Sequence, residues 1–357
     1  GNPAGLAETD DDAVRRALLR LTADPAAPVE SRFFGAAERI RRRLDDALLG
    51  ATVSVTMLDH WEEAVAEYGR QYMTLPPLRL LCDVLLDLGD VRRMCEHRQP
   101  LEFGERLCAL AARLAGLAGM IMINVADQRL ARSFFSTARS AADETGDRPL
   151  RAWVAVREAL VPLYYGDPRQ AAAAARAGAD LAGRKACPAG VMAPIVEARA
   201  VAWLARTGGG GRGSFGRRVN LALERAHDAF EALPAEQQAG TAFGYTERQQ
   251  LFHEGDALVT LGDYRGADDA FRQAMRQYAP DEFLDRSLVT LGQARCRFAA
   301  GEPEEAIRLS QETLRRLPSQ YRPGLVLRAA RSLGDAVAAK HGDLPAMRDY
   351  REALLTG

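Results

Sequence analysis

One glycine pattern in the chain matches a nucleotide-binding motif letter by letter. Gly211, Gly213 and Gly216 form G-x-G-x-x-G inside "RTGGGGRGSFGRR" (residues 206–218). A dinucleotide site also needs a strand before the glycines, a βαβ unit around them and an acidic residue beyond the second strand. Here the helical stretch "EARAVAWLA" comes first. We therefore interpret the pattern as a chance match and predict a mobile loop at residues 206–218.

Groups that could bind a metal or catalyse acid–base chemistry are present but not assembled. Cys95 and His97 stand alone, and "HEGDA" (residues 253–257) lacks the second histidine of a zinc-binding helix. Three neighbouring acids are explained by favourable placement near the start of a helix: Asp281, Glu282 and Asp285. We therefore predict that the chain is not an enzyme and that it uses no metal and no cofactor.

The composition indicates a protein of the cytoplasm without bulk affinity for charged surfaces. The chain has 47 Lys+Arg and 48 Asp+Glu, so its net charge of -1 attracts neither nucleic acid nor anionic lipid. Five cysteines fall inside helical patterns and are expected to be buried free thiols: Cys82, Cys95, Cys108, Cys187 and Cys296. We find no signal peptide and no apolar run long enough to cross a membrane.

The hydrophobic pattern predicts helices throughout. Apolar residues recur at i, i+3, i+4 and i+7, and the alternation expected of strands is absent. The first predicted helices cover residues 10–21, 30–49, 55–73, 77–96 and 101–125. The fold class is therefore all-α. We expect residues 1–100 to precede or cap an array of helical repeats that fills residues 101–357.

The repeats are recognised by the spacing of small and aromatic residues. Two segments place a glycine, an alanine, an aromatic residue and an alanine at offsets of 0, 12, 16 and 19: Gly119, Ala131, Phe135, Ala138, and Gly255, Ala267, Phe271, Ala274. This is the spacing of a tetratricopeptide unit, in which small residues let two helices approach and the aromatic ring fills the space between them. Weaker units cover residues 164–178, 221–234, 299–318 and, in degenerate form, 324–355. The prediction is a right-handed α-solenoid of about five tetratricopeptide-like hairpins.

In such an array the first helix of each pair lines a concave groove, and polar or aromatic groups that point there are available to a ligand. The inward positions are Arg113, Asn124, Trp153, Arg157, Tyr164, Glu197, His253, Asp256 and Arg295. Arg157 and Arg295 are suited to clamp a carboxylate or an extended peptide backbone, with Trp153 and Tyr164 as apolar walls. The alternative is that each of these residues serves ordinary helix packing or salt bridges.

Several long phrases also resemble one family. They are "DHWEEAVAEYGRQYMTLPPLRLLCDVLLDL" (59–88), "ADETGDRPLRAWVAVREALVPLYYGDP" (142–168), "FGYTERQQLFHEGDALVTLGDYRGA" (243–267) and "PDEFLDRSLVTLGQARCRFAAGEPEEAI" (280–307). They resemble the regulatory half of large actinobacterial regulators, in which a lambda-repressor-type helix-turn-helix precedes a tetratricopeptide array. The resemblance covers roughly residues 55–333. It implies a cytoplasmic sensor that binds a peptide, a small molecule or a protein partner and changes the geometry of attached DNA-binding domains, with a homodimer as one expected arrangement.

The N-terminal residues depart from that family. Residues 1–54 predict about two amphipathic helices and the proline-rich link "TADPAAPVE", whereas a helix-turn-helix of this type needs a compact multi-helix unit. We expect DNA contact only through a domain absent from this chain, which either precedes Gly1 or was never part of this relative. The second functional hypothesis is a stand-alone tetratricopeptide scaffold that joins proteins without DNA.

Overall fold

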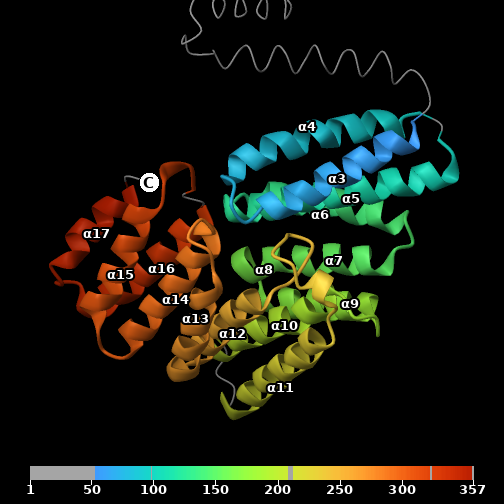
Figure 1. The fold of residues 1–357 in the computed structure, drawn as a ribbon. Coiled ribbons are helices and arrows are strands. Elements are labelled where there is room, and N and C mark those ends of the chain that lie inside the picture. Colours follow the sequence, from blue (N-terminus) through green and yellow to red (C-terminus); the bar gives the residue numbers. More distant parts are fainter. Residues whose placement is uncertain (1–52, 98, 208–211, 322–323, 356–357) are drawn as a thin grey trace, which may run out of the picture. The chain divides into compact units, whose positions relative to one another are not determined.

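The computed structural model describes residues 53–97, 99–207, 212–321 and 324–355, and within these ranges the regular structure is helical, without strands (Figure 1). The chain divides into a unit of residues 1–57 and a unit of residues 58–357. Nearly all of the first unit lies outside the described residues, including the helices expected at residues 10–21 and 30–49. The second unit contains nearly all of the described residues.

The α-helices follow one another in chain order, with single 3-10 turns η1 (Ala235–Gln237) and η2 (Ser319–Tyr321) between some of them. They are α3 (Val55–Gln71), α4 (Pro77–Cys95), α5 (Leu101–Asn124), α6 (Gln128–Asp143), α7 (Arg148–Glu158), α8 (Leu160–Tyr165), α9 (Pro168–Ala182), α10 (Pro188–Thr207), α11 (Arg212–Glu231), α12 (Glu247–Leu261), α13 (Tyr264–Gln277), α14 (Phe283–Ala299), α15 (Pro303–Arg316), α16 (Gly324–His341) and α17 (Ala346–Leu355). The predicted helices at 55–73, 77–96 and 101–125 agree with α3, α4 and α5 to within two residues.

The helices from α5 onward pack in successive pairs. The pairs are α5 with α6, α7 with α9, α10 with α11, α12 with α13, α14 with α15 and α16 with α17. The first helix of each pair also contacts the first helix of the next, so that α5, α7, α10, α12, α14 and α16 form a continuous series, which we call the first-helix row. In Figure 1 the pairs follow one another from the green to the red end of the chain. The predicted all-α class is thus confirmed, and consecutive helices pack against one another.

Aspartates fix where several second helices begin. The side chains of Asp127, Asp167 and Asp263 accept hydrogen bonds from backbone N–H groups in the first turns of α6, α9 and α13. An N-terminal cap of this kind satisfies a donor that has no partner inside the helix. The short turn between paired helices is therefore encoded locally.

The predicted contact between glycine and aromatic residue is present in both strict units. A Cβ added at Gly119 would lie 2.8 Å from Phe135, and one added at Gly255 would lie 2.6 Å from Phe271. Gly292 of α14 reaches the same Phe271 ring, at 2.4 Å from a Cβ placed there. The Phe271 ring is therefore held between α12 and α14, and it couples one helix pair to the next.

The last pair obeys the same spacing, although the sequence suggested a degenerate unit. Gly334 is followed at offsets of 12, 16 and 19 by Ala346, Tyr350 and Ala353. A Cβ at Gly334 would lie 2.6 Å from the Tyr350 ring, which is fully buried. The Tyr350 hydroxyl donates to the carbonyl of Ala330 at 2.7 Å and pairs with Ser310. A tyrosine fills the aromatic position here because a polar partner lies within its reach.

The last helix of the first-helix row, α16, packs against the first one, α5. Nearby, the Tyr165 hydroxyl donates to the carbonyl of Ile123, and the guanidinium of Arg328 lies 5.1 Å from the centre of the Tyr165 ring. These contacts bring the two ends of the row together, although they are far apart in sequence.

Helix α5 corrects one expectation from the sequence. It has 24 residues and a mean hydropathy of 1.7 over its most apolar window, so it is long and apolar enough to cross a membrane. The expectation that no run in the chain reaches that length is wrong. Most of this window, 78%, is buried, because α5 packs against α4, α6, α7 and α16.

Two further expectations are corrected. The loop predicted at residues 206–218 is helical from Arg212 onward, and α10 extends to Thr207; residues 208–211 lie outside the described residues. Gly213 and Gly216 are therefore in α11, where neighbouring helix-forming residues outweigh the cost of glycine. The cysteines are free, but Cys82 and Cys95 are exposed and Cys108 is half-buried, so only Cys187 and Cys296 are buried as expected.

The double contact on Phe271 gives a stability prediction. We expect Gly255→Ala to lower the free energy of unfolding by about 1–3 kcal/mol, because the added methyl group meets a ring that Gly292 already confines. Gly89→Ala in α4 is the matched control. A Cβ there meets no atom within 4 Å, so it should raise stability by about 0.5–1 kcal/mol. Urea unfolding of both variants checks this, and equal effects would contradict the packing argument.

Candidate binding site

An ion-pair bridge connects three consecutive helices of the first-helix row. Asp256 of α12 accepts from Nε of Arg199 in α10 at 3.0 Å and from Nη1 of Arg295 in α14 at 3.0 Å. Arg295 also donates to Thr260 Oγ1 at 3.1 Å. Burial acts to raise the pKa of Asp256, but the two arginines outweigh it and lower the pKa below its ordinary value. The carboxylate is therefore held ionised between the helices.

Arg199 is the most enclosed member of this bridge. Its side chain is 3% exposed, and its Nη2 donates to the Tyr164 hydroxyl of α8 at 3.0 Å. Its guanidinium also lies 5.0 Å from the centre of the Tyr164 ring. Its Nη1 is buried and has no hydrogen-bond partner among the described residues. A buried donor without a partner is costly, so this atom is available to an acceptor.

Trp153 and Arg157 of α7 bind a backbone carbonyl from a distant segment. Trp153 Nε1 donates to the carbonyl of Ala242 at 3.0 Å, and Arg157 Nη2 donates to the same oxygen at 3.1 Å. Both side chains are 6% exposed. Arg157 Nε is buried without a partner among the described residues, and burial lowers the pKa of Arg157. A guanidinium bound mainly by one neutral carbonyl is under-compensated.

We call the ion-pair bridge together with Tyr164, Trp153, Arg157, Tyr245 and His253 the cluster. His253 of α12 is a neutral member of it. Its Nδ1 lies 2.8 Å from the hydroxyl of Tyr245, and its ring lies 4.8 Å from that of Phe252, centre to centre. Burial, followed by the positive charges of Arg199 and Arg157, lowers the pKa of His253 well below its ordinary value. The imidazole therefore serves as a neutral hydrogen-bonding group at physiological pH.

The structure places the remaining predicted residues differently. Asn124 of α5 donates to the Tyr72 hydroxyl at 2.9 Å and lines a cleft with Leu80, Ile121 and Tyr321 that has room for about one water molecule. Tyr72 is half-buried, and the loss of water around its hydroxyl raises its pKa to about 12. Asn124 therefore lies at the edge of the cluster.

Glu197 and Arg113 are not brought into the cluster. Glu197 of α10 pairs with Arg176 of α9 at 3.1 Å and with Arg225 of α11 at 2.8 Å, so its carboxylate faces the second helices. Arg113 is half-buried on α5, and within the described ranges it takes part in none of the hydrogen bonds or ion pairs of the cluster.

Sequence reasoning missed Arg199, Tyr245 and the Ala242 carbonyl. Arg199 could have been found, because it is a charged residue inside the apolar stretch "VMAPIVEARAVAWLA" (residues 191–205), where a cation is expected to be buried and paired. The Ala242 carbonyl could not, because its partners are 85 and 89 residues away in sequence.

Asp285 also has an environment that the sequence did not indicate. Its carboxylate accepts from the Tyr278 hydroxyl at 3.1 Å. Burial, with a smaller contribution from Glu282, raises the pKa of Asp285 to about 6, against the lowering effects of Tyr278, Arg157 and Arg248. Placement near a helix start therefore does not describe its main interactions.

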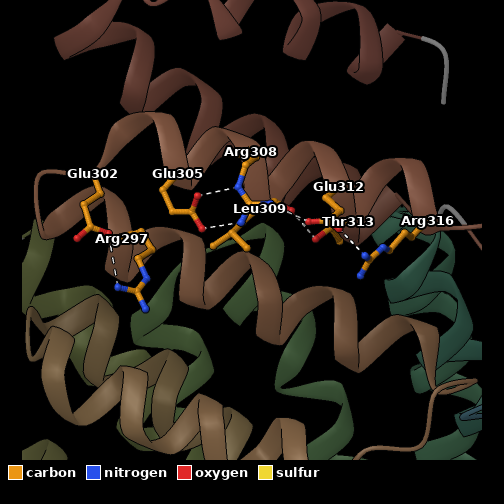
Figure 2. A network of polar contacts seen from close by, with 8 residues as sticks. All are labelled: Arg297, Glu302, Glu305, Arg308, Leu309, Glu312, Thr313 and Arg316. Atoms are coloured by element: carbon orange, nitrogen blue, oxygen red, sulfur yellow. Dashed lines mark hydrogen bonds and ion pairs between the residues drawn. The ribbon is translucent and has the colours of Figure 1, made fainter.

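The cluster differs from the ion pairs on the outer helices. Figure 2 shows Glu305, Arg308, Glu312 and Arg316 along α15, with Arg297 and Glu302 beside them. The Arg308 side chain is 58% exposed and pairs with Glu305 at 2.7 Å and Glu312 at 3.1 Å. Exposed pairs of this kind contribute little to stability because water screens them.

The chain matches no protein-family model and no curated protein sequence.

The ion-pair bridge predicts a large effect of Asp256→Ala. We expect a loss of about 3–5 kcal/mol in the free energy of unfolding, because Arg199 then keeps a buried charge without its carboxylate. Glu305→Ala on α15 is the control and should change stability by less than about 1 kcal/mol. Urea unfolding measures both, and adding Arg199→Met to Asp256→Ala should restore part of the loss. A small effect of Asp256→Ala would show that the bridge is not structural.

Asp285 predicts a pH dependence of stability. Its pKa in the folded chain, about 6, lies above the unfolded value of about 3.9, so its favourable contribution is complete below about pH 4 and is lost as the pH rises through 6. We expect Asp285→Asn to raise the free energy of unfolding by roughly 1–3 kcal/mol at pH 7.5 and much less at pH 4.5. Exposed Asp281→Asn is the control. A gain for Asp285→Asn that is equal at both pH values would contradict the assignment.

Proposed function

We propose that this chain is the binding and sensing part of a transcriptional regulator of the family that its sequence resembles. In this proposal its helix pairs form a right-handed α-solenoid of tetratricopeptide type, and the first-helix row lines the binding groove. One observation supports it above all others. Trp153 and Arg157 together bind the backbone carbonyl of Ala242, so this face already binds a segment of polypeptide backbone.

The chemistry of the cluster favours a ligand rich in hydrogen-bond acceptors. Arg157 and Arg199 each keep one buried nitrogen without a partner among the described residues. The Trp153 indole is a donor only, and the guanidinium group has donors and no acceptor. A peptide backbone or a carboxylate supplies the acceptors that these groups lack.

The ion-pair bridge offers a route from binding to a change of shape. Asp256 fixes α10 and α14 relative to α12 through Arg199 and Arg295. A ligand that binds Arg199 weakens one of these contacts. This changes the packing of neighbouring helix pairs, because the pairs are coupled through the faces that they share. The resulting change in the curvature of the array would alter the relative positions of attached DNA-binding domains.

The binding function is tested with a library of fluorescent peptides measured by polarisation. We expect ligands found with the unaltered chain to lose at least roughly 10-fold in affinity with Arg157→Ala and with Arg295→Ala. Arg308→Ala, on the outer α15, is the matched control and should leave the affinity unchanged. If Arg157→Ala and Arg295→Ala also leave the affinity unchanged, the ligand does not bind the first-helix row.

The regulatory role is tested by the intact mass of the protein isolated from its own cells. We expect a species heavier than the 38.9 kDa of this chain by one small helical domain. A mass equal to that of this chain would contradict the regulator proposal and favour a scaffold that joins proteins without DNA.

A further inference from the structure

The connection between α11 and α12, residues 232–246, is longer than any other connection between helices in the described part of the chain. Its last ten residues, 237–246, which we call the α11–α12 loop, carry the Ala242 carbonyl to α7. Connections of this length in a compact domain are uncommon and are usually functional. The contacts of Ala242 place this connection beside α7, and in Figure 1 it does not turn directly from α11 into α12.

The α11–α12 loop contacts the first-helix row as a bound peptide would. Its Ala242 carbonyl accepts from Trp153 and Arg157, and the Ala242 N–H donates to the carbonyl of Gly69 at 2.9 Å. The carbonyl of Gly69 belongs to the last turn of α3, where helix carbonyls lack partners within the helix. Both backbone groups of one residue are thus recognised by side chains and backbone from elsewhere in the chain.

Two aromatic side chains anchor the loop. The Phe243 ring lies 5.1 Å from the Trp153 ring, centre to centre, and it occupies the space where Gly69 has no side chain, 2.7 Å from an added Cβ. Tyr245 is fully buried, with its hydroxyl on His253. Hydrogen bonds to the peptide backbone, combined with separate pockets for side chains, are typical of peptide recognition by a groove.

The loop is also a self-contained unit. Tyr245 N–H donates to the carbonyl of Gln237 at 3.0 Å, and Gly244 N–H donates to the carbonyl of Thr241 at 3.2 Å. A Cβ at Gly244 would lie 2.3 Å from the carbonyl oxygen of Ala239, so the tight turn requires glycine. Compact loops closed by their own hydrogen bonds can leave a surface without unfolding the helices on either side.

Packing alone does not explain why an arginine, Arg157, lies beneath the loop. Arg157 is 6% exposed, yet within the described ranges its only hydrogen-bond partner is the neutral carbonyl of Ala242. An apolar side chain of similar size would bury the same surface without the cost of a charge. A cation at this position is understandable if the loop alternates with a ligand that offers a stronger acceptor.

We propose that the α11–α12 loop is an internal ligand of the binding site, and that the external ligand is a peptide with a turn that presents a backbone carbonyl followed by an aromatic residue, as Ala242 and Phe243 do. This inference rests on the proposed peptide-binding function. The external peptide displaces the loop from Trp153, Arg157 and Gly69. Because a tethered ligand has an effective concentration of about millimolar, the loop sets the threshold that an external peptide must exceed.

The experiment uses a fluorescent peptide of the loop sequence, QQAGTAFGYT (residues 237–246), added to the full chain. Phe243→Ala removes the aromatic anchor of the internal ligand and leaves Trp153, Arg157 and Gly69 in place. We expect the variant to bind the peptide at least roughly 10-fold more tightly than the unaltered chain does, because a larger fraction of molecules has an open site. A peptide with alanine in place of its phenylalanine should lose this gain.

Phe283→Ala is the matched control variant. This substitution also removes an aromatic contact, because the Phe283 ring of α14 lies 4.7 Å from the Tyr321 ring, centre to centre. Phe283 lies outside the loop and is not one of the residues Trp153, Arg157 and Gly69 that the loop contacts. We expect the affinity of Phe283→Ala for the peptide to equal that of the unaltered chain. A gain of the same size in both variants would reflect general loosening and would overturn the proposal.

The remaining outcomes separate this inference from the proposed function. If the unaltered chain and Phe243→Ala bind the peptide equally well, the site binds peptides but the loop does not compete for it. If neither binds, the loop is not a ligand at all, and the proposed function is decided by the peptide library alone. Either result overturns the internal-ligand proposal.

Hydrogen exchange on the unaltered chain gives an answer even if Phe243→Ala does not fold. We expect the amides of Ala242, Gly244 and Tyr245 to exchange at least roughly 100-fold faster than buried amides of α12 such as that of Val259, because the loop opens without global unfolding. Exchange of the loop amides as slow as that of Val259 would show that the loop is a permanent part of the core and would overturn the proposal.

Discussion

The burial of arginine charge on the first-helix row is the constraint on which the rest of the arrangement depends. Arg199 is 3% exposed and Arg157 is 6% exposed, and each must find compensation inside the protein. Arg199 finds it in Asp256, which also binds Arg295, so the charge requirement of one side chain positions three helices. Among the described residues, Arg157 has one hydrogen-bond partner, a carbonyl of the α11–α12 loop, and the charge of Asp285 acts on it as well. The same requirement thus fixes part of the row and ties a long connection to another part.

The charge of Arg199 and Arg157 also sets the state of their neighbours. Their positive charges add to burial in lowering the pKa of His253, which is therefore neutral, and this allows its contact with Tyr245 without a further buried charge. Asp256 remains ionised because two guanidinium groups contact it, whereas Asp285, with a tyrosine hydroxyl as its hydrogen-bond partner, has a raised pKa. Two carboxylates of the same chemical type therefore titrate in different pH ranges: Asp256 is still ionised at pH values where Asp285 is protonated.

The sequence predicted what depends on spacing within one helix pair. Gly255 and Phe271 are 16 residues apart, and two helices joined by a short turn bring such residues together whatever the rest of the chain does. The same logic failed to recognise Gly334 and Tyr350 only because tyrosine stands at the aromatic position. Of the residues in the cluster, the sequence indicated those on α7, α8, α12 and α14 but not how they group, and it also indicated Glu197, which faces the second helices.

The α11–α12 loop shows why that grouping lay beyond sequence reasoning. Local signals mark residues 237–246 as a turn rich in glycine and small polar residues, and nothing local states which surface it contacts. The contact arises from complementarity between distant groups: a carbonyl for two donors, a ring for a glycine without a side chain, and a hydroxyl for a neutral imidazole. Each of these is a feature that a peptide from another molecule could equally provide. Because this surface binds a segment of its own chain through such general chemistry, the same groups can bind a similar segment of another molecule.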